Sequence, residues 1–342
     1  MAEIIPIHQH KLNFNEAVKN LSILCKEDLL SINTLILEKL DSSVPLIQEI
    51  GKYLILSGGK RLRPLLTTSC FHILNNESIN KINHVGLAAA VEFIHAATLL
   101  HDDVVDLSKD RRGKLTSNEV WGNKTSVLVG DFLFSRSFQL MTKFGNMETL
   151  KILSDTSVII SEGEVLEISN DKNLEMNEDT YFKIINGKTA SLFSAACQVG
   201  GISGDAKYNE HQALKSFGTN FGMTFQLIDD AIDYSSNSEI MGKNVGDDFK
   251  EGKITLPIIL AYGRSNKEEK KFLQNVISKP NKDENNFNLT KKLLLKYKCI
   301  EDTLIRAHHF ADVAIDSLSI FSNNEYKKAL IKLIETSIRR LA

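Results

Sequence analysis

Apolar residues recur along most of this chain with the spacing of helices rather than of strands. In HVGLAAAVEFIHAATLLHDDVVD, residues 84–106, they fall on more than one helical face, which predicts a buried helix. Few stretches show the period-two alternation of strands. The pattern therefore predicts an all-α protein with almost no sheet, and further helices are expected around 127–142, 149–169, 189–200 and 210–234.

The distribution of proline supports this prediction. Proline breaks the interior of a helix, and none of the five prolines falls between Pro64 and Pro257. No clean domain boundary interrupts the helical pattern. We therefore expect a single domain over residues 1–342, with a loose tail at 1–12 and a polar surface excursion at 265–290.

Composition narrows the class of protein without identifying it. The 342 residues are 42% hydrophobic and 25% charged, with a net charge of −2, as in soluble globular proteins. This charge gives no reason to expect nucleic acid as a partner. Four scattered cysteines lack metal-site spacing, and the amino terminus lacks a signal-peptide pattern. We expect a cytoplasmic protein without a transmembrane segment, with peripheral membrane contact left open.

An acidic pattern, DDxxD, occurs twice. Positions i and i+4 of a helix share a face, so the first and last aspartates of each copy point the same way. Such carboxylates repel one another unless a cation lies between them, and their oxygens suit Mg²⁺ bridging to phosphates, with Mn²⁺ as the alternative. Both copies follow strongly apolar segments, which favours a metal site over a solvated helix end. The residues are Asp102, Asp103, Asp106, Asp229, Asp230 and Asp233.

Basic residues beside glycines form a second pattern. In GGKRLRP, residues 58–64, paired glycines let the backbone approach an anion, while Lys and Arg supply charged donors. RRGK follows the first acidic motif, and lysines recur in GKTASLF and GKNVGDDFKEGKITLP. Arginine suits bidentate contact with phosphate oxygens. Two anion sites beside a carboxylate metal site would suit two diphosphate substrates.

With these motifs the sequence resembles the trans-isoprenyl diphosphate synthase family, and most of all its long-chain, octaprenyl-type members. The matching motifs are GGKRLRP, EFIHAATLLHDDVVD, RRGK, WGNKTSVLVGDF, EGEVLEI, GKTASLF, FQLIDDAIDY and GKNVGDDFKEGKITLP, which span residues 58–257 in the family's order. The resemblance implies a large antiparallel helical bundle around a central active-site cavity, and a homodimer.

The resemblance also implies a role for each matching residue. The six aspartates would hold two or three Mg²⁺ ions on the allylic diphosphate from facing helices, with Lys188 completing the catalytic set. Isopentenyl diphosphate would bind to Lys60, Arg63, His95 and Arg112. The allylic diphosphate would contact Arg111, Lys188, Thr189, Gln226, Lys243 and Lys253.

The reaction implied is head-to-tail condensation of isopentenyl diphosphate with an allylic diphosphate such as farnesyl diphosphate. Metal and basic residues would neutralise the leaving diphosphate, and the double bond of isopentenyl diphosphate would attack the allylic cation. The product would be a long all-trans polyprenyl diphosphate, most simply octaprenyl, for quinone side chains. A terpene cyclase and a non-catalytic regulatory subunit are the alternatives, and the two intact DDxxD motifs argue against both.

Product length should depend on the helix before the first DDxxD. Ala97 and Thr98, five and four residues before Asp102, are small, and large aromatics at these positions stop growth early in the family. Their size predicts an open channel and a long product. The remaining candidates for its walls and floor are Ile94, Phe134, Phe138 and Met141.

The chain departs from the family pattern at three places. Glu167 stands where similar sequences often carry Gln, which adds a negative charge near the expected site. Ile232 replaces the commoner Leu inside the second DDxxD. The tail SIRRLA has no clear match, so the resemblance assigns no role to Arg339 or Arg340.

Overall fold

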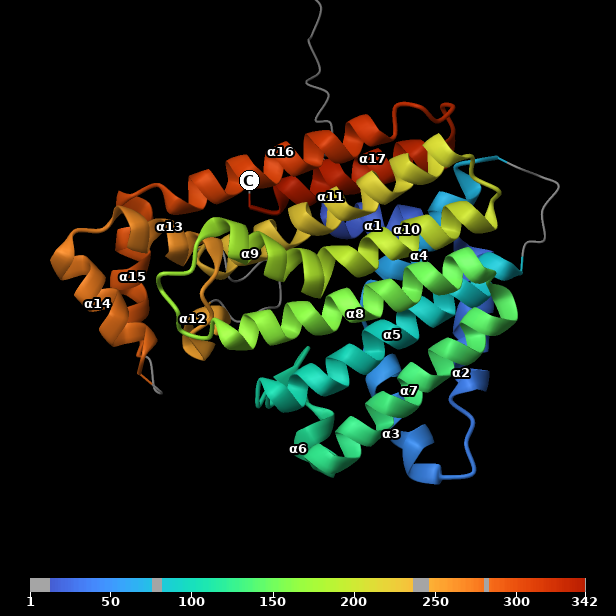
Figure 1. Cartoon of the computed structure of the whole chain (residues 1–342), viewed down its shortest axis with the longest axis horizontal. Coiled ribbons are helices and arrows are strands. Elements are labelled where there is room, and N and C mark those ends of the chain that lie inside the picture. Colours follow the sequence, from blue (N-terminus) through green and yellow to red (C-terminus); the bar gives the residue numbers. More distant parts are fainter. Residues whose placement is uncertain (1–12, 76–81, 236–245, 280–282, 342) are drawn as a thin grey trace, which may run out of the picture.

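The computed structural model describes residues 13–75, 82–235, 246–279 and 283–341, and almost all regular structure in these ranges is helical (Figure 1). This confirms the predicted all-α class. Among the described residues, the strands are β1 (Asp110–Arg111) and β2 (Lys114–Leu115), a two-residue antiparallel ribbon. The first half holds α1 (Phe14–Leu24), α2 (Lys26–Lys39), α3 (Pro45–Leu56), α4 (Leu62–His72), α5 (Asn83–Val105), α6 (Ser117–Trp121), α7 (Asn123–Phe144) and α8 (Met147–Ser169).

The second half begins with a short helix that runs into a π-helical turn. It contains α9 (Glu178–Ile185), the π-turn η1 (Asn186–Ala190), α10 (Ser191–Ser203), α11 (Tyr208–Asp233), α12 (Asp247–Glu251), α13 (Leu256–Arg264), α14 (Lys267–Ile277), α15 (Glu284–Lys296), α16 (Cys299–Ser317), α17 (Glu325–Ile338) and the 3₁₀ turn η3 (Arg339–Leu341).

The long helices lie roughly side by side (Figure 1). In that view α16 and α17 run along one edge, α5, α7 and α3 lie toward the opposite edge, and α8, α10 and α11 run between them. Helices α13, α14 and α15 gather at one end of the molecule. The carboxyl terminus lies beside α11, which brings the end of the chain close to the second DDxxD.

The polar segment 265–290 is more regular than its composition indicated. Most of it is helix, as α14 and the beginning of α15. Asn266 caps α14 with a reciprocal pair of hydrogen bonds to Glu269, and Leu273 and Ile277 of the same helix are fully buried. The excursion is therefore a helical one, because a narrow apolar stripe on a mostly polar helix is enough to anchor it.

Helix α5 carries the first acidic motif and is the most buried long helix. By length and composition it could cross a membrane, but 78% of its apolar window is buried inside this structure. It packs in a cluster with α2, α3, α7, α8 and α10, with Phe93, Ile94 and Leu100 fully buried. Such burial is typical of a core helix, so its hydrophobicity reflects packing.

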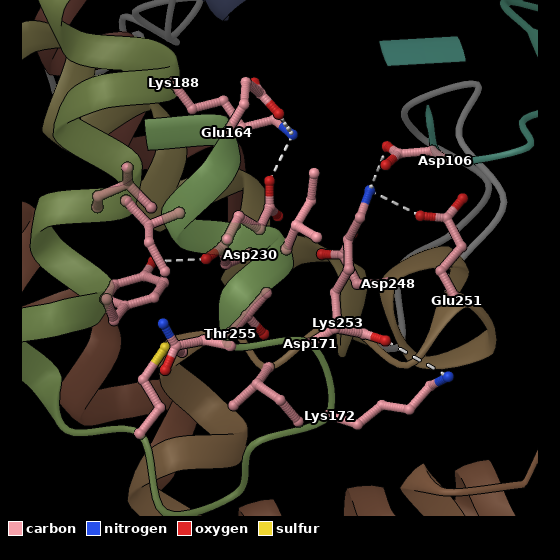
Figure 2. A pocket seen from close by; sticks show the side chains of 18 of the residues that line it. Asp106, Glu164, Asp171, Lys172, Lys188, Asp230, Asp248, Glu251, Lys253 and Thr255 are labelled. Carbon is pink, nitrogen blue, oxygen red and sulfur yellow. Dashed lines mark hydrogen bonds and ion pairs between the residues drawn. The ribbon is translucent and has the colours of Figure 1, made fainter. Parts of the chain in front are cut away.

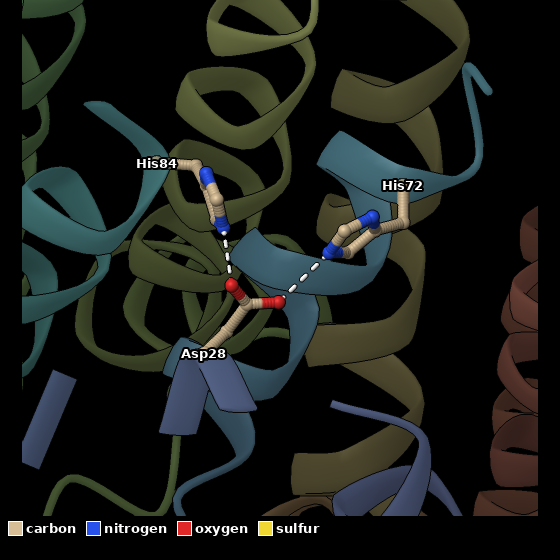
Figure 3. A group of neighbouring side chains, drawn as sticks. All are labelled: Asp28, His72 and His84. Carbon is tan, nitrogen blue, oxygen red and sulfur yellow. Dashed lines mark hydrogen bonds and ion pairs between the residues drawn. The ribbon is translucent and has the colours of Figure 1, made fainter. Parts of the chain in front are cut away.

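A carboxylate flanked by two histidines joins α2 to α4 and to α5 (Figure 3). Asp28 accepts from His72 Nε2 at 2.7 Å and from His84 Nε2 at 3.0 Å. The His84 ring is fully buried and stacks on Phe71 at 3.9 Å between centroids. Burial raises the pKa of Asp28, but the two histidine hydrogen bonds outweigh it and hold that pKa well below its usual range.

These three residues could also surround a metal ion, but the hydrogen bonding favours a clamp. The buried Nδ1 of His84 has no hydrogen-bond partner in the described chain. A metal on Nε2 would move the ring proton to Nδ1, where it would lack an acceptor. A proton on Nε2, donated to Asp28, avoids that cost, so the trio holds helices together.

Candidate active site

The first DDxxD lies at the carboxyl-terminal end of α5, and its aspartates point to different partners. Asp103 is buried, and both its oxygens accept hydrogen bonds from Arg111. Arg111 Nε and Nη2 lie 2.9 and 2.6 Å from Asp103 Oδ1. Asp106 faces Lys253 at 3.2 Å. Burial, with the neighbouring Glu164 carboxylate, raises the pKa of Asp102 to about 7. Asp103 therefore holds Arg111 and Asp106 holds Lys253, and a cation at this motif would have to compete with Lys253 for Asp106.

The second DDxxD ends α11, and each of its aspartates also has a partner. Asp229 Oδ1 lies 2.8 Å from Arg340 Nη2. The buried Asp230 accepts from the Tyr181 hydroxyl at 2.5 Å and from Gln226 Nε2 at 2.7 Å. Burial and the nearby Asp248 carboxylate raise the pKa of Asp230 above its usual range.

Asp233, the last aspartate of this motif, caps the next helix. Its oxygens accept from the backbone N–H groups of Asp247 and Asp248 at 3.1 and 3.2 Å. These are first-turn residues of α12. The cap fixes the start of α12 relative to the end of α11 and so places Asp248 beside Asp230.

A cavity of about 500 Å³ lies between the two motifs (Figure 2). Asp106 lines it from the first motif and Asp230 from the second. Among the described residues that line it, seven are Asp or Glu and three are Lys. Because Asp106 and Asp230 line the same cavity, the fold brings the two motifs together, and the excess of carboxylates makes the cavity attractive to cations. The other acidic residues are Glu164, Glu167, Asp171, Asp248 and Glu251.

Each of two cavity lysines is held between two carboxylates. Lys188 Nζ lies 3.0 Å from Glu164 and 2.6 Å from Glu167, and Lys253 Nζ lies 3.2 Å from Asp106 and 2.7 Å from Glu251 (Figure 2). Burial lowers the pKa of both lysines, but the carboxylates outweigh it and raise both above the usual range. Both lysines are therefore charged at neutral pH.

Close backbone packing places Lys188. The α-carbon of Gly187 in η1 packs against Gly163 of α8, so that a Cβ on Gly163 would come within 3.0 Å of Gly187 Cα and of the Lys188 nitrogen. The π-turn adds a residue to the helical register, a distortion frequent at functional sites. Next to it, Thr189 donates to Gln226 at 2.9 Å, so both predicted residues lie in the same cavity.

The residues expected to bind isopentenyl diphosphate form a separate basic cluster. Arg63 packs over the Phe193 ring, and burial lowers the pKa of this arginine to about 10. Burial lowers the pKa of His95 well below its usual range, and the arginines at 63, 112, 111 and 61 lower it further. His95 is therefore neutral among guanidinium groups, an environment that would attract an anion.

The glycine pair shapes this cluster. Gly58 and Gly59 have φ of +93° and +135°, and Gly58 O accepts from Arg112. A Cβ on Gly59 would meet the Arg112 guanidinium at 2.7 Å. Lys60 of the same loop is exposed and lies 4.7 Å from the Phe14 ring centroid. Lys243, predicted to bind the allylic diphosphate, lies outside the described residues.

The residues expected to set product length do not line this cavity. Ile94 and Ala97 are buried in α5, and Thr98 is half-buried. Across from them in α7, Met141 is buried and Phe134 half-buried.

The position of Phe138 does not fit its expected place on the channel floor. It is 38% exposed, and its ring packs edge-on against Phe134 at 5.1 Å. The buried face of α7 passes through Leu133, Ser137 and Met141. Position 138 falls outside that face, so in the single chain Phe138 does not floor an interior channel.

Several site residues received no role from the sequence. Glu164 could have been suspected, because EGEVLEI places it and Glu167 at i and i+3 on one helical face, whereas no motif contains Tyr181. Asp248 lies well after the second motif in sequence, and the hydrogen bonds from the first turn of α12 to Asp233 bring it close to that motif. Arg340 was given no role, yet its side chain is only 6% exposed and contacts Asp229.

The donor set fits a hard divalent cation. Such ions take oxygen ligands, and carboxylates exceed lysines among the cavity's described residues. Burial raises the pKa of Glu164 and of Asp102, and neighbouring carboxylates add to both shifts, so a bound cation would stabilise the ionised form of each.

The chain is similar to known proteins over nearly its whole length. Residues 44–294 match the model of the polyprenyl synthetase family. It is 40% identical to octaprenyl diphosphate synthase of Escherichia coli over 325 residues, covering 94% of this chain and 99% of that protein.

Solved structures agree with this similarity. The fold matches a decaprenyl diphosphate synthase from Rhodobacter capsulatus with a TM-score of 0.90 and 43% identity, covering 95% of this chain and 99% of that one. It also matches a polyprenyl synthase from Caulobacter crescentus, complexed with calcium and isoprenyl diphosphate, with a TM-score of 0.89 and 42% identity, covering 95% and 98%. On sequence, fold and site together, this chain belongs to the polyprenyl synthetase family.

Proposed function

We propose that this chain is a Mg²⁺-dependent trans-prenyltransferase that condenses isopentenyl diphosphate with an allylic diphosphate, such as farnesyl diphosphate, to give a long all-trans polyprenyl diphosphate of the octaprenyl class. The observation that carries this proposal is the cavity between the two DDxxD motifs, with lysines on its walls. Its relatives named octaprenyl and decaprenyl diphosphate synthase support a long product.

Within this cavity the aspartates and the lysines would have different roles. Asp102 and Asp106 from α5, with the second motif from α11, would hold Mg²⁺, which supplies charge neutralisation to the leaving diphosphate. Lys188 and Lys253 would bind the same diphosphate. Asp103 would act by positioning Arg111, since both its oxygens are already engaged.

The second substrate would bind at the basic cluster. Arg63 and Arg112 would hold the diphosphate of isopentenyl diphosphate, with the neutral His95 beside them. Holding two reactants in one orientation and excluding water from the allylic cation are the main contributions of such a site. The proton lost in the condensation would pass to the released diphosphate, so no protein nucleophile is required.

A product assay tests this proposal. Purified protein is incubated with both substrates and Mg²⁺, with an EDTA control, and the dephosphorylated products are sized by mass spectrometry. A metal-dependent ladder ending near eight isoprene units is the expected result. A ladder ending at three or four units would keep the chemistry but refute the long channel. Intact substrates would favour the regulatory subunit, and cyclic hydrocarbon would favour the terpene cyclase.

The active-site aspartates give a sharper test of the same proposal. Asp102→Ala removes a proposed ligand of the cation, and we expect turnover to fall at least ~10²-fold. Near-normal turnover would remove Asp102 from this role.

We also propose that the enzyme is a cytoplasmic homodimer. The outer faces of α7 and α8 expose large apolar side chains, including Leu128 (67%), Val158 (57%) and Val165 (62%). Exposed apolar side chains on two long helices favour a protein interface there over solvent. Light scattering during gel filtration should give twice the chain mass of 38.3 kDa, and a monomer would refute the proposal. Peripheral membrane contact for release of a lipid product stays a prediction.

A further inference from the structure

Lys188, assigned above to the allylic diphosphate, has carboxylates on two sides. Its ammonium group lies 3.0 Å from Glu164 Oε2 and 2.6 Å from Glu167 Oε2. The three side chains are 21–30% exposed, so they are partly desolvated but open to the cavity. One positive and two negative charges leave the trio with a net charge of −1. A diphosphate approaching Lys188 therefore meets a net repulsion until a carboxylate gives way.

The two glutamates differ in their surroundings. Glu164 also interacts with Asp102, whose pKa it raises, so a cation bound at Asp102 would attract Glu164 as well. Glu167 lies almost one helical turn further along α8, and it accepts the shorter of the two hydrogen bonds from Lys188. Binding of a cation at the first DDxxD would thus relieve the charge of Glu164 more than that of Glu167.

We infer that Glu167 is a positioning residue that competes with the diphosphate for Lys188. In the ligand-free site it holds the lysine, and it takes the lysine back when the diphosphate leaves. It weakens binding of the allylic diphosphate and hastens release of pyrophosphate and of product. The inference rests on the proposed function, because it assumes that Lys188 binds the allylic diphosphate.

Glu167→Gln tests the inference with little change of shape. The amide oxygen still accepts from Lys188, but the competing charge is gone. The matched control is Glu162→Gln, the same change on the exposed side of α8. Binding of inorganic pyrophosphate with Mg²⁺ is measured by titration calorimetry for both variants and for the parent chain. KM for farnesyl diphosphate and kcat are measured in parallel.

For Glu167→Gln we expect pyrophosphate to bind about five-fold more tightly, as for loss of one partly exposed ion pair. KM should fall by a similar factor, and kcat should not rise. Glu162→Gln should match the parent chain. Glu167→Asp, which restores the charge, should return KM toward the parent value. These shifts separate competition from a merely structural role.

Two results would overturn the inference. Glu167→Gln could bind pyrophosphate no more tightly than the parent chain, or Glu162→Gln could shift binding equally, which would indicate a general charge effect. Failure of the proposed function looks different, because the parent chain would then form no condensation product. Pyrophosphate binding reports on Lys188 independently of that outcome.

Discussion

A methyl group added at Gly163 should test whether close packing of α8 against η1 holds Lys188 in place. The Cβ of Gly163→Ala would lie 3.0 Å from Gly187 Cα and 3.0 Å from the Lys188 nitrogen, closer than most Cβ contacts in proteins. All the atoms it meets belong to the backbone. No side chain can rotate away, so the two segments must move apart by several tenths of an ångström.

Two opposing effects decide the stability of this variant. Alanine in a helix interior is favoured over glycine by roughly 0.5–1 kcal/mol. Overpacking costs typically about 1–3 kcal/mol, and the upper part of that range applies where only backbone can yield. The expected net result is a loss of about 2 kcal/mol in the free energy of unfolding. In a chain of this size the melting temperature should fall by about 3 °C.

Activity should fall with the displacement of Lys188. A misplacement of 1 Å can cost about 10²-fold, so a shift of half that size should lower kcat/KM about ten-fold. The matched control is Gly263→Ala in α13, where nothing lies within 4 Å of the added Cβ, so that variant should be at least as stable as the parent chain and equally active. Thermal melting and steady-state kinetics compare the two. If Gly163→Ala behaves like Gly263→Ala, the close packing does not position the lysine.

Three further predictions follow from the site and the core. Because the pKa of Asp102 is about 7 and a metal binds its ionised form, Mg²⁺ affinity measured by titration should strengthen between pH 6 and pH 8. Asp102→Asn should flatten this pH dependence. An equal slope in the parent chain and the variant would contradict the prediction. Asp28→Ala leaves the Nε2 proton of His84 buried without an acceptor and should lower the free energy of unfolding at pH 7 by about 2 kcal/mol. The folded protein holds the pKa of Asp28 below that of the unfolded chain, so Asp28 stabilises the fold above the unfolded pKa and loses this effect as the pH falls toward the folded pKa. The difference in unfolding free energy between parent and variant should therefore shrink below about pH 4. A difference that stays constant with pH would refute the clamp. Ala97→Phe should shorten the product, measured as a truncated prenyl ladder, because position 97 is 1% exposed and an aromatic ring there must enter any adjacent channel; an unchanged ladder would reject the channel assignment.

The sequence by itself determined the fold class and the chemical identity of the site. Helical periodicity and the proline-free stretch predicted α5, α8 and α11, because the spacing of apolar residues within one segment indicates which face of its helix is buried. The two DDxxD motifs end α5 and α11, so their carboxylates were predictable as the ends of buried helices. The same patterns underestimated 265–290, where a few apolar residues suffice for a helix.

Only the tertiary structure decided how these residues pair. Asp103 and Arg111 neutralise each other, and Lys188 lies between two glutamates more than twenty residues earlier in the chain. Arg340 reaches Asp229 from the last turn. Such contacts depend on where helices cross, as at Gly163 and Gly187, and spacing along one helix carries no information about its neighbours. The physical reason is that charge pairing acts through space, whereas periodicity reports only which face of each helix is buried.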